Sequence, residues 1–355
     1  MSKRTGAEMP AGGTPVRFQA RDLAPLLFGL RTAAAALVAL WLAMWLQLDN
    51  PRWAAWTVMA LALPTRGQIA LKGLWRMVGT LLGLAAGLVG VALFSQNSLG
   101  MGLFLAVWMS LAALVGGRLP ALAAYGAALA GLTACLIALE SSGAPLSAFA
   151  LALERTSSIA LGIVCAYAAS ALSEVFQGAA DNAAPVVFPQ PSPATIRANA
   201  ERVFVTFAIG WIIWVVTAWS SGPIFIVLVG ALVVNFTTVP NVDRAAWGAL
   251  WGVGLGQALG LILKYAVLTT TPAFGVLAGA LFPFLFLGGV GMTDRRSLLP
   301  TTGFNISFLL AVEPLNPMQY DLAASLNEAL AIFLGVALVV AGFRFIRPEL
   351  VWRLP

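Results

Sequence analysis

Long apolar runs separated by short polar segments make up most of the chain. The runs cover about residues 23–48, 53–63, 74–94, 100–115, 121–139 and 148–172 in the first half, and 203–219, 223–236, 246–268, 274–292, 298–312 and 322–343 in the second. A helix needs about 20 apolar residues to cross a hydrocarbon core roughly 30 Å thick. The pattern therefore predicts an all-α polytopic membrane protein of about twelve transmembrane helices, six in each half.

Polar segments divide this sequence into five parts. We expect a basic cytoplasmic tail at 1–21, a first membrane repeat at 22–173, a second at 201–347 and a short tail at 348–355. The segment 174–200 contains four prolines and predicts a cytoplasmic linker rather than a packed domain.

Several residues recur at one spacing in the two halves. Glu140 and Glu313 are 173 positions apart (313 minus 140), and Trp41 with Trp214 repeats this spacing. Six spans per half make the repeat parallel, so the two halves should be related by an axis along the membrane normal. A pore or cavity between the halves would follow from that arrangement.

Composition and charge agree with a membrane protein. Hydrophobic residues make up 60% of the chain, charged residues 10%, and the mean hydropathy is +0.90. The absence of histidine excludes histidine metal sites and Ser-His-Asp hydrolysis, and we expect no metal or cofactor. The net charge of +6 lies in short loops and tails, which indicates membrane topology rather than nucleic-acid binding.

The distribution of cations also predicts the orientation. Cytoplasmic loops are enriched in Lys and Arg. Sixteen of these residues fall on the side of the N-terminus, whereas only Arg52 and Lys264 fall on the other side, and Arg31 and Arg155 lie inside spans. Both termini are therefore expected in the cytoplasm.

The second apolar run is too short to span a bilayer as a helix. Its eleven residues, 53–63, reach about 17 Å at the ~1.5 Å rise of an α-helix, and Pro64 follows them. Either the helix continues through Pro64, or the chain breaks at membrane depth. A break survives there only beside protein or a water-filled cavity, and transporters often bind substrates at such places.

Polar and cationic residues follow this proline. Arg66 comes directly after the turn, while Gln68, Lys72 and Arg76 are spaced by four and would share one helix face. Together with the N–H groups at the start of the new helix, they would attract an anion. The alternative interpretation is that the cations fix the topology.

Four further residues complete the candidate site. Arg31, about one third of the way into the first span, could add a cation, and Asn305 could face a polar cavity. Glu154 and Glu328, each in the last span of its half, are candidate proton carriers. The alternative for these carboxylates is a place near the outer interface or a partner on a neighbouring helix.

The glycine stripes and most of the aromatic residues are interpreted as structural rather than as substrate-binding. Gly79, Gly83 and Gly87 recur every four residues, as do Gly248, Gly252, Gly256 and Gly260, and such stripes let helices pack closely. Trp41, Trp45, Trp53, Trp56, Trp75, Tyr125 and Trp214 could stack on an aromatic ligand, but most are interpreted as an interfacial belt.

Residues 30–83 resemble the first membrane block of the fusaric-acid-resistance and aromatic-acid exporter family. The resemblance is carried by Asp49-Asn50-Pro51, by Pro64 to Gln68, and by Lys72, Arg76 and Gly79-Thr80. It implies proton-driven export of small aromatic carboxylic acids across a bacterial inner membrane, beside a periplasmic adaptor protein. Longer members of the family carry a cytoplasmic helical region after the sixth span, where this chain has only the short linker. Whether the chain is a compact member or a trimmed one stays open.

The sequence therefore favours a transporter for small organic anions, coupled to protons, in a lipid bilayer. A passive organic-anion channel and a non-transporting membrane scaffold stay open as alternatives, and a homo-oligomer is compatible with each. No nucleophile with a neighbouring base is visible in the sequence, so an enzyme is not expected.

Overall fold

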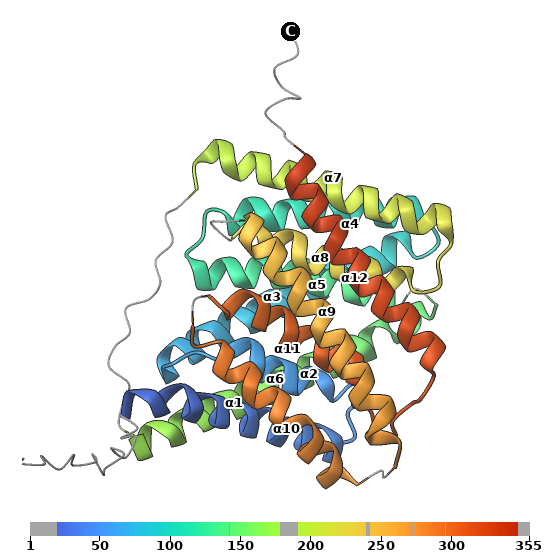
Figure 1. Cartoon of the computed structure of the whole chain (residues 1–355). Helices are drawn as coiled ribbons and strands as arrows, with labels where there is room; N and C mark the ends of the chain where they lie inside the picture. The colour runs from blue at the N-terminus through green and yellow to red at the C-terminus, as the bar shows by residue number, and fades with distance from the viewer. Residues whose placement is uncertain are drawn as a thin grey trace, which may run out of the picture.

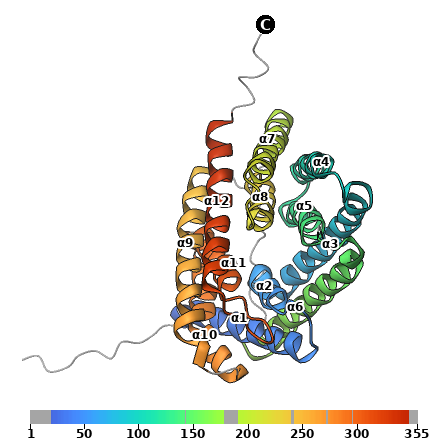
Figure 2. The same cartoon turned by 90° about the vertical axis from the view of Figure 1, so that its right-hand side faces the viewer.

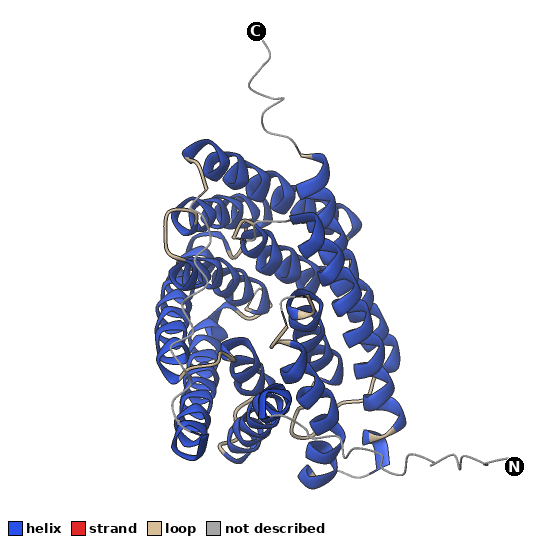
Figure 3. Ribbon diagram, turned by 60° about the vertical axis from the view of Figure 1, so that its left-hand side comes forward, coloured by secondary structure: helices blue, strands red, loops and turns tan. Residues whose placement is uncertain are grey.

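The computed structural model describes residues 20–141, 143–177, 191–238, 242–270, 273–294 and 296–346. Within these ranges the secondary structure is helical and contains no strand (Figure 3). Most of the predicted basic tail, the middle of the predicted linker and the last residues lie outside the described part of the chain.

Twelve α-helices follow one another in the described residues. They are α1 (Ala20–Trp45), α2 (Arg52–Leu61), α3 (Arg66–Phe94), α4 (Ser98–Gly116), α5 (Ala121–Glu140), α6 (Ala148–Gln177), α7 (Pro193–Thr217), α8 (Gly222–Phe236), α9 (Val242–Ala266), α10 (Phe274–Gly291), α11 (Leu298–Val312) and α12 (Leu322–Phe345). Nine helices in the described ranges are long and apolar enough to cross a membrane. The shorter α2, α8 and α11 correspond to the apolar runs 53–63, 223–236 and 298–312. The predicted all-helical membrane fold is confirmed.

The helix packing follows the same order in both halves. α7 begins at residue 193 and α1 at residue 20, a difference of 173 (193 minus 20). α3 packs on α5 as α9 packs on α11, and α2 packs on α6 as α8 packs on α12. α1 lies against α10 of the other half, and α7 against α4 (Figures 1 and 2). A single axis relating the halves stays a prediction, as does the orientation of the termini.

The first glycine stripe brings α3 very close to α5. A Cβ atom added at Gly79 would lie 2.1 Å from the carbonyl oxygen of Gly126, and one added at Gly83 would lie 2.6 Å from that of Ala130. In the second half, a Cβ added at Gly252 of α9 would lie 2.0 Å from the carbonyl oxygen of Pro300 in α11. The predicted packing role of both stripes is confirmed.

Helix α7 begins earlier than its apolar run at 203–219 predicts. It starts at Pro193, inside the predicted linker 174–200. The Ser192 hydroxyl accepts a hydrogen bond from the Thr195 N–H group at 3.2 Å and caps the helix, and proline is favoured at the first helical position. Ile196 in this first turn is buried. Local capping thus extends the helix beyond its apolar run.

Adding a methyl group to the glycine stripe should destabilise the protein. Gly79→Ala is expected to cost about 1–3 kcal/mol, because the new methyl overlaps the backbone of α5. In the control Gly275→Ala the added Cβ meets nothing within 4 Å, so this variant should be neutral or slightly stabilised. Thermal unfolding of the purified proteins in detergent measures both effects, and equal melting temperatures would contradict the close α3–α5 packing.

Candidate anion-binding site

The helical path is interrupted at Pro64. α2 ends at Leu61 and α3 begins at Arg66. Between them, Thr65 has extended backbone angles of φ −112° and ψ 147°. Seven of the ten residues of α2 are buried, so the interruption lies among packed helices. Of the two alternatives drawn from the sequence, the structure has the broken chain.

Two cations hydrogen-bond to the carbonyl groups at this interruption. The Lys72 ammonium donates to the Ala60 carbonyl oxygen at 2.6 Å. The Arg31 guanidinium donates to the Leu63 carbonyl oxygen at 2.7 Å. The last carbonyls of a helix have no partner within it, and leaving them bare in an apolar environment costs several kcal/mol. Lys72 and Arg31 therefore stabilise the break.

The start of α3 already binds a carboxylate of the protein itself. The Arg66 N–H group donates to Glu174 Oε1 at 2.8 Å, and the Arg66 side chain forms an ion pair with Glu174 Oε2 at 3.3 Å. The Gln68 N–H group donates to the Thr65 hydroxyl at 3.3 Å. The N–H groups that the sequence assigns to an anion are thus partly occupied. Arg66 is exposed and faces α6, whereas Arg76 on the same helix is buried.

Arg76 is a deeply buried cation that has no counter-ion among the described residues. Its side chain is only 3% exposed, and no carboxylate among the described residues forms an ion pair with it. It donates to the Tyr125 hydroxyl of α5, and its Cζ atom lies 5.9 Å from the ring centre of Trp56. The Lys72 ammonium lies 5.0 Å from the Tyr125 ring. Two cations therefore meet at one tyrosine.

Unused donors surround this guanidinium. Arg76 Nε, Trp56 Nε1 and the Thr80 hydroxyl are buried and have no hydrogen-bond partner. An unsatisfied buried polar group costs about 1–3 kcal/mol, and natural proteins keep few of them unless a ligand, water or function explains them. Arg76 and Thr80 are one helical turn apart on α3. A carboxylate is the ligand that would satisfy these donors.

Aromatic rings and cations alternate from this point along α2. The ring centres of Trp53 and Trp56 lie 4.5 Å apart. The Cζ atom of Arg155, on α6, lies 3.8 Å from the Trp53 ring centre. The order Lys72, Arg76, Arg155 follows α2 from residue 60 to residue 53, which is about 10 Å at the ~1.5 Å rise of a helix. We call these residues, with Tyr125, the cation–aromatic row.

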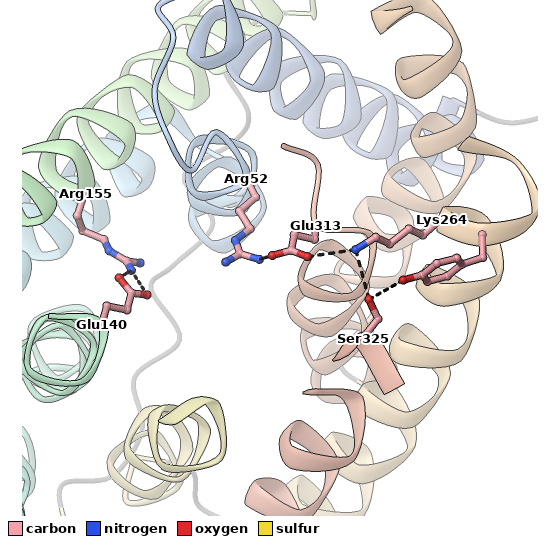
Figure 4. A network of polar contacts seen from close by, with 7 residues as sticks. Arg52, Glu140, Arg155, Lys264, Glu313 and Ser325 are labelled. Carbon is pink, nitrogen blue, oxygen red and sulfur yellow. Dashed lines mark hydrogen bonds and ion pairs between the residues drawn. The ribbon is translucent and has the colours of Figure 1, made fainter. Parts of the chain in front are cut away.

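The Trp53 end of the row carries two ionic clusters (Figure 4). Arg155 Nη2 donates to both carboxylate oxygens of Glu140 at 2.9 Å. In the second cluster, Glu313 accepts from Arg52 at 3.2 Å and from Lys264 at 3.1 Å. Because Arg52 begins α2 and Glu313 follows α11, the second cluster links the two halves of the chain.

The two proposed proton carriers lie in different surroundings. Glu154 is half-buried, and its Oε1 accepts from the Asn50 N–H group at 3.0 Å and from the Ser158 hydroxyl at 3.3 Å, while its Oε2 is buried without a partner. Glu328, near the start of α12, is exposed. Two hydrogen bonds therefore hold the Glu154 carboxylate within the protein, whereas the Glu328 side chain is exposed.

Asn305 lies apart from the cations of the row. It is buried on α11, and its amide nitrogen lies 3.4 Å from the Gly288 carbonyl oxygen of α10. Its Oδ1 atom has no partner. No hydrogen bond or ion pair of the described chain joins it to Arg76 or Lys72. Its predicted role in substrate binding stays a prediction.

Sequence reasoning does not find the ionic partners at the Trp53 end of the row. The pattern of cations places Arg52 and Lys264 in loops opposite the N-terminus, and Glu140 stands out only through its repeat spacing. The signal that could have identified the clusters was the equivalent placement of Glu140 and Glu313 at the ends of two apolar runs. Each carboxylate pairs with a buried cation, and both Arg155 and Lys264 are only 2% exposed.

These features define a multi-pass helical membrane protein with buried cations and aromatic rings along an interrupted helix. Residues 25–182 and 174–352 both match the fusaric acid resistance protein family. The chain belongs to this family. No solved structure matches the chain.

Several curated proteins are similar to part of the chain. An uncharacterized transporter of Gluconobacter oxydans is 32% identical over 154 residues, which are 42% of this chain and 21% of that protein. The p-hydroxybenzoic acid efflux pump subunit AaeB of Pectobacterium carotovorum is 32% identical over 167 residues, or 44% of this chain and 25% of that protein. AaeB of Escherichia coli O1:K1 is 32% identical over 154 residues, with shares of 41% and 24%. The matched segment thus spans about a quarter of these relatives.

Removing the lysine at the interruption should destabilise the fold. Lys72→Met leaves the Ala60 carbonyl group without its partner and is expected to cost about 1–3 kcal/mol. The control Arg118→Met also removes a cation that donates to a carbonyl, that of Leu114, but this residue is exposed, so water can replace it. Thermal unfolding in detergent compares the two. A Lys72→Met protein as stable as the wild type would contradict the capping role.

Proposed function

We propose that the chain transports small aromatic carboxylates out of the cytoplasm across a bacterial inner membrane. The observation that carries the proposal is Arg76, a buried guanidinium between Trp56 and Tyr125 that has no counter-ion among the described residues. Burying an unpaired charge costs several kcal/mol, so ionisable groups inside a membrane usually serve a function. Membership of the fusaric acid resistance family and the likeness to the AaeB efflux subunits support the same substrate class.

The chemistry of the site suits an aromatic acid. A substrate carboxylate would accept hydrogen bonds from Arg76 Nε and Trp56 Nε1, two buried donors that have no partner among the described residues. Its ring would pack against Trp56 or Tyr125, where aromatic pairs are worth about 0.5–1.5 kcal/mol beyond the buried area. Lys72 would add positive charge on the side of the interruption. Arg66, exposed at the start of α3, would serve as an entry contact rather than part of the buried site.

Proton coupling is the second part of the proposal. Glu154 would carry the proton, because its Oε2 atom is buried and has no hydrogen-bond partner. It accepts a hydrogen bond from the Asn50 N–H group and lies next in sequence to Arg155, so its charge state would act on the Trp53 end of the cation–aromatic row. Glu328 would contribute less, since it is exposed. A periplasmic adaptor protein, as the family resemblance implies, would receive the substrate.

Substrate affinity should depend on the Arg76 guanidinium. Arg76→Gln is expected to raise the Kd for 4-hydroxybenzoate by about 10- to 100-fold, since hydrogen bonds to charged groups are worth about 1.5–3 kcal/mol. Arg118→Gln, which removes an exposed cation, is the control and should bind as the wild type does. Isothermal titration calorimetry on the purified proteins measures both constants. Equal affinities of the wild type and Arg76→Gln would refute this site.

Proton-driven flux should depend on Glu154. In reconstituted vesicles, a pH step should drive movement of radiolabelled 4-hydroxybenzoate, and Glu154→Gln should abolish this drive while Glu328→Gln reduces it less. The glutamine keeps the size of the side chain but holds no exchangeable charge. Anion current driven by voltage alone that persists in the double variant would instead indicate a channel, and no flux in any protein would favour a scaffold.

A further inference from the structure

The ion pair between Arg155 and Glu140 joins one buried partner to one accessible partner. The Arg155 side chain is 2% exposed and the Glu140 side chain 34%. The guanidinium rests on Trp53, with Cζ 3.8 Å from the ring centre. Glu140 is the last residue of α5, and within the described part of the chain its carboxylate hydrogen-bonds to Arg155 alone. The carboxylate can therefore leave while the cation stays in place.

The guanidinium of Arg155 also has hydrogen-bonding capacity left over. Only Nη2 contacts Glu140, and it reaches both carboxylate oxygens at 2.9 Å. Nε is buried and has no partner. Arginine binds carboxylates best through two parallel N–H groups. Glu140 thus leaves part of the hydrogen-bonding capacity of the Arg155 guanidinium unused. An incoming carboxylate could bind Arg155 through two parallel N–H groups.

The carboxylate at the equivalent position of the second half is held differently. Glu313 contacts two cations, Arg52 at 3.2 Å and Lys264 at 3.1 Å. Removing it would leave both of these charges without their partner, whereas removing Glu140 affects only Arg155. Of the two clusters in Figure 4, the one at Arg155 is therefore the exchangeable one.

We propose that Glu140 is a competing counter-ion, which a substrate carboxylate displaces from Arg155 while its aromatic ring packs on Trp53. This inference rests on the proposed transport of aromatic carboxylates and adds a second, outer binding position to the one at Arg76. Exchange of one carboxylate for another keeps Arg155 neutralised throughout. Substrate can then leave without exposing a bare buried cation, whose cost would otherwise oppose release.

The test is a gain of affinity, which loss of a merely structural ion pair would not produce. Glu140→Gln should lower the Kd for 4-hydroxybenzoate about tenfold, because the substrate no longer competes with a charged group. Methyl 4-hydroxybenzoate, which has the same ring but no carboxylate, should show no gain. Glu313→Gln, the matched variant at the equivalent position, should show none either. Calorimetry on the purified full chain gives the constants, and quenching of tryptophan fluorescence checks them.

Glu140→Asp serves as a second variant in case Glu140→Gln does not fold. It keeps the charge but is one methylene too short for the present contact, so it should give a smaller gain in affinity. Unchanged or weaker binding in a folded Glu140 variant overturns the counter-ion role, as does an equal gain for the methyl ester. If the counter-ion role fails but the wild type still binds 4-hydroxybenzoate and Arg76→Gln does not, the transport proposal survives. If no protein in the set binds it, both proposals fall.

Discussion

The backbone carbonyl groups at the interruption of α2 impose the constraint on which the site depends. A helix that stops among apolar side chains leaves acceptors that water cannot reach, and these must be satisfied from within the protein. Lys72 and Arg31 do this from α3 and α1. The interruption thus explains why long cationic side chains are present at this depth, and it holds three helices together around them.

The cations inside the helix bundle differ chiefly in their partners. The buried Arg155 and Lys264 each pair with a carboxylate, and the half-buried Lys72 donates to a carbonyl oxygen. Arg76 has a tyrosine hydroxyl and two aromatic rings nearby but no carboxylate among the described residues. The residue types around it have a common property: each is of a kind that binds a carboxylate or packs against an aromatic ring. That combination distinguishes Arg76 from cations that only stabilise the fold.

Patterns local to the chain predicted much of the fold. Apolar runs located all twelve helices, Pro64 located the interruption, and the glycine intervals predicted the close packing of α3 on α5. The ion pairs could not be found in this way, because helical spacing identifies only neighbours on the same helix. Arg52 and Glu313 are 261 positions apart, and Arg66 turned to Glu174 on α6 rather than toward Arg76. The equivalent placement of Glu140 and Glu313 carried the one hint of the clusters.

The packing of helices from one half against helices of the other half affects how the chain folds. α1 packs against α10, which begins at Phe274, and α4 packs against α7. During synthesis, α1 enters the bilayer long before α10 has been made. Until then, the face of α1 that packs against α10 must contact lipid or another protein. Contacts between residues so distant in sequence form slowly. If the first six helices were produced alone, the surfaces of α4 and α1 that α7 and α10 cover would be left uncovered. Assembly of this membrane domain is therefore completed only after the ribosome has translated most of the chain.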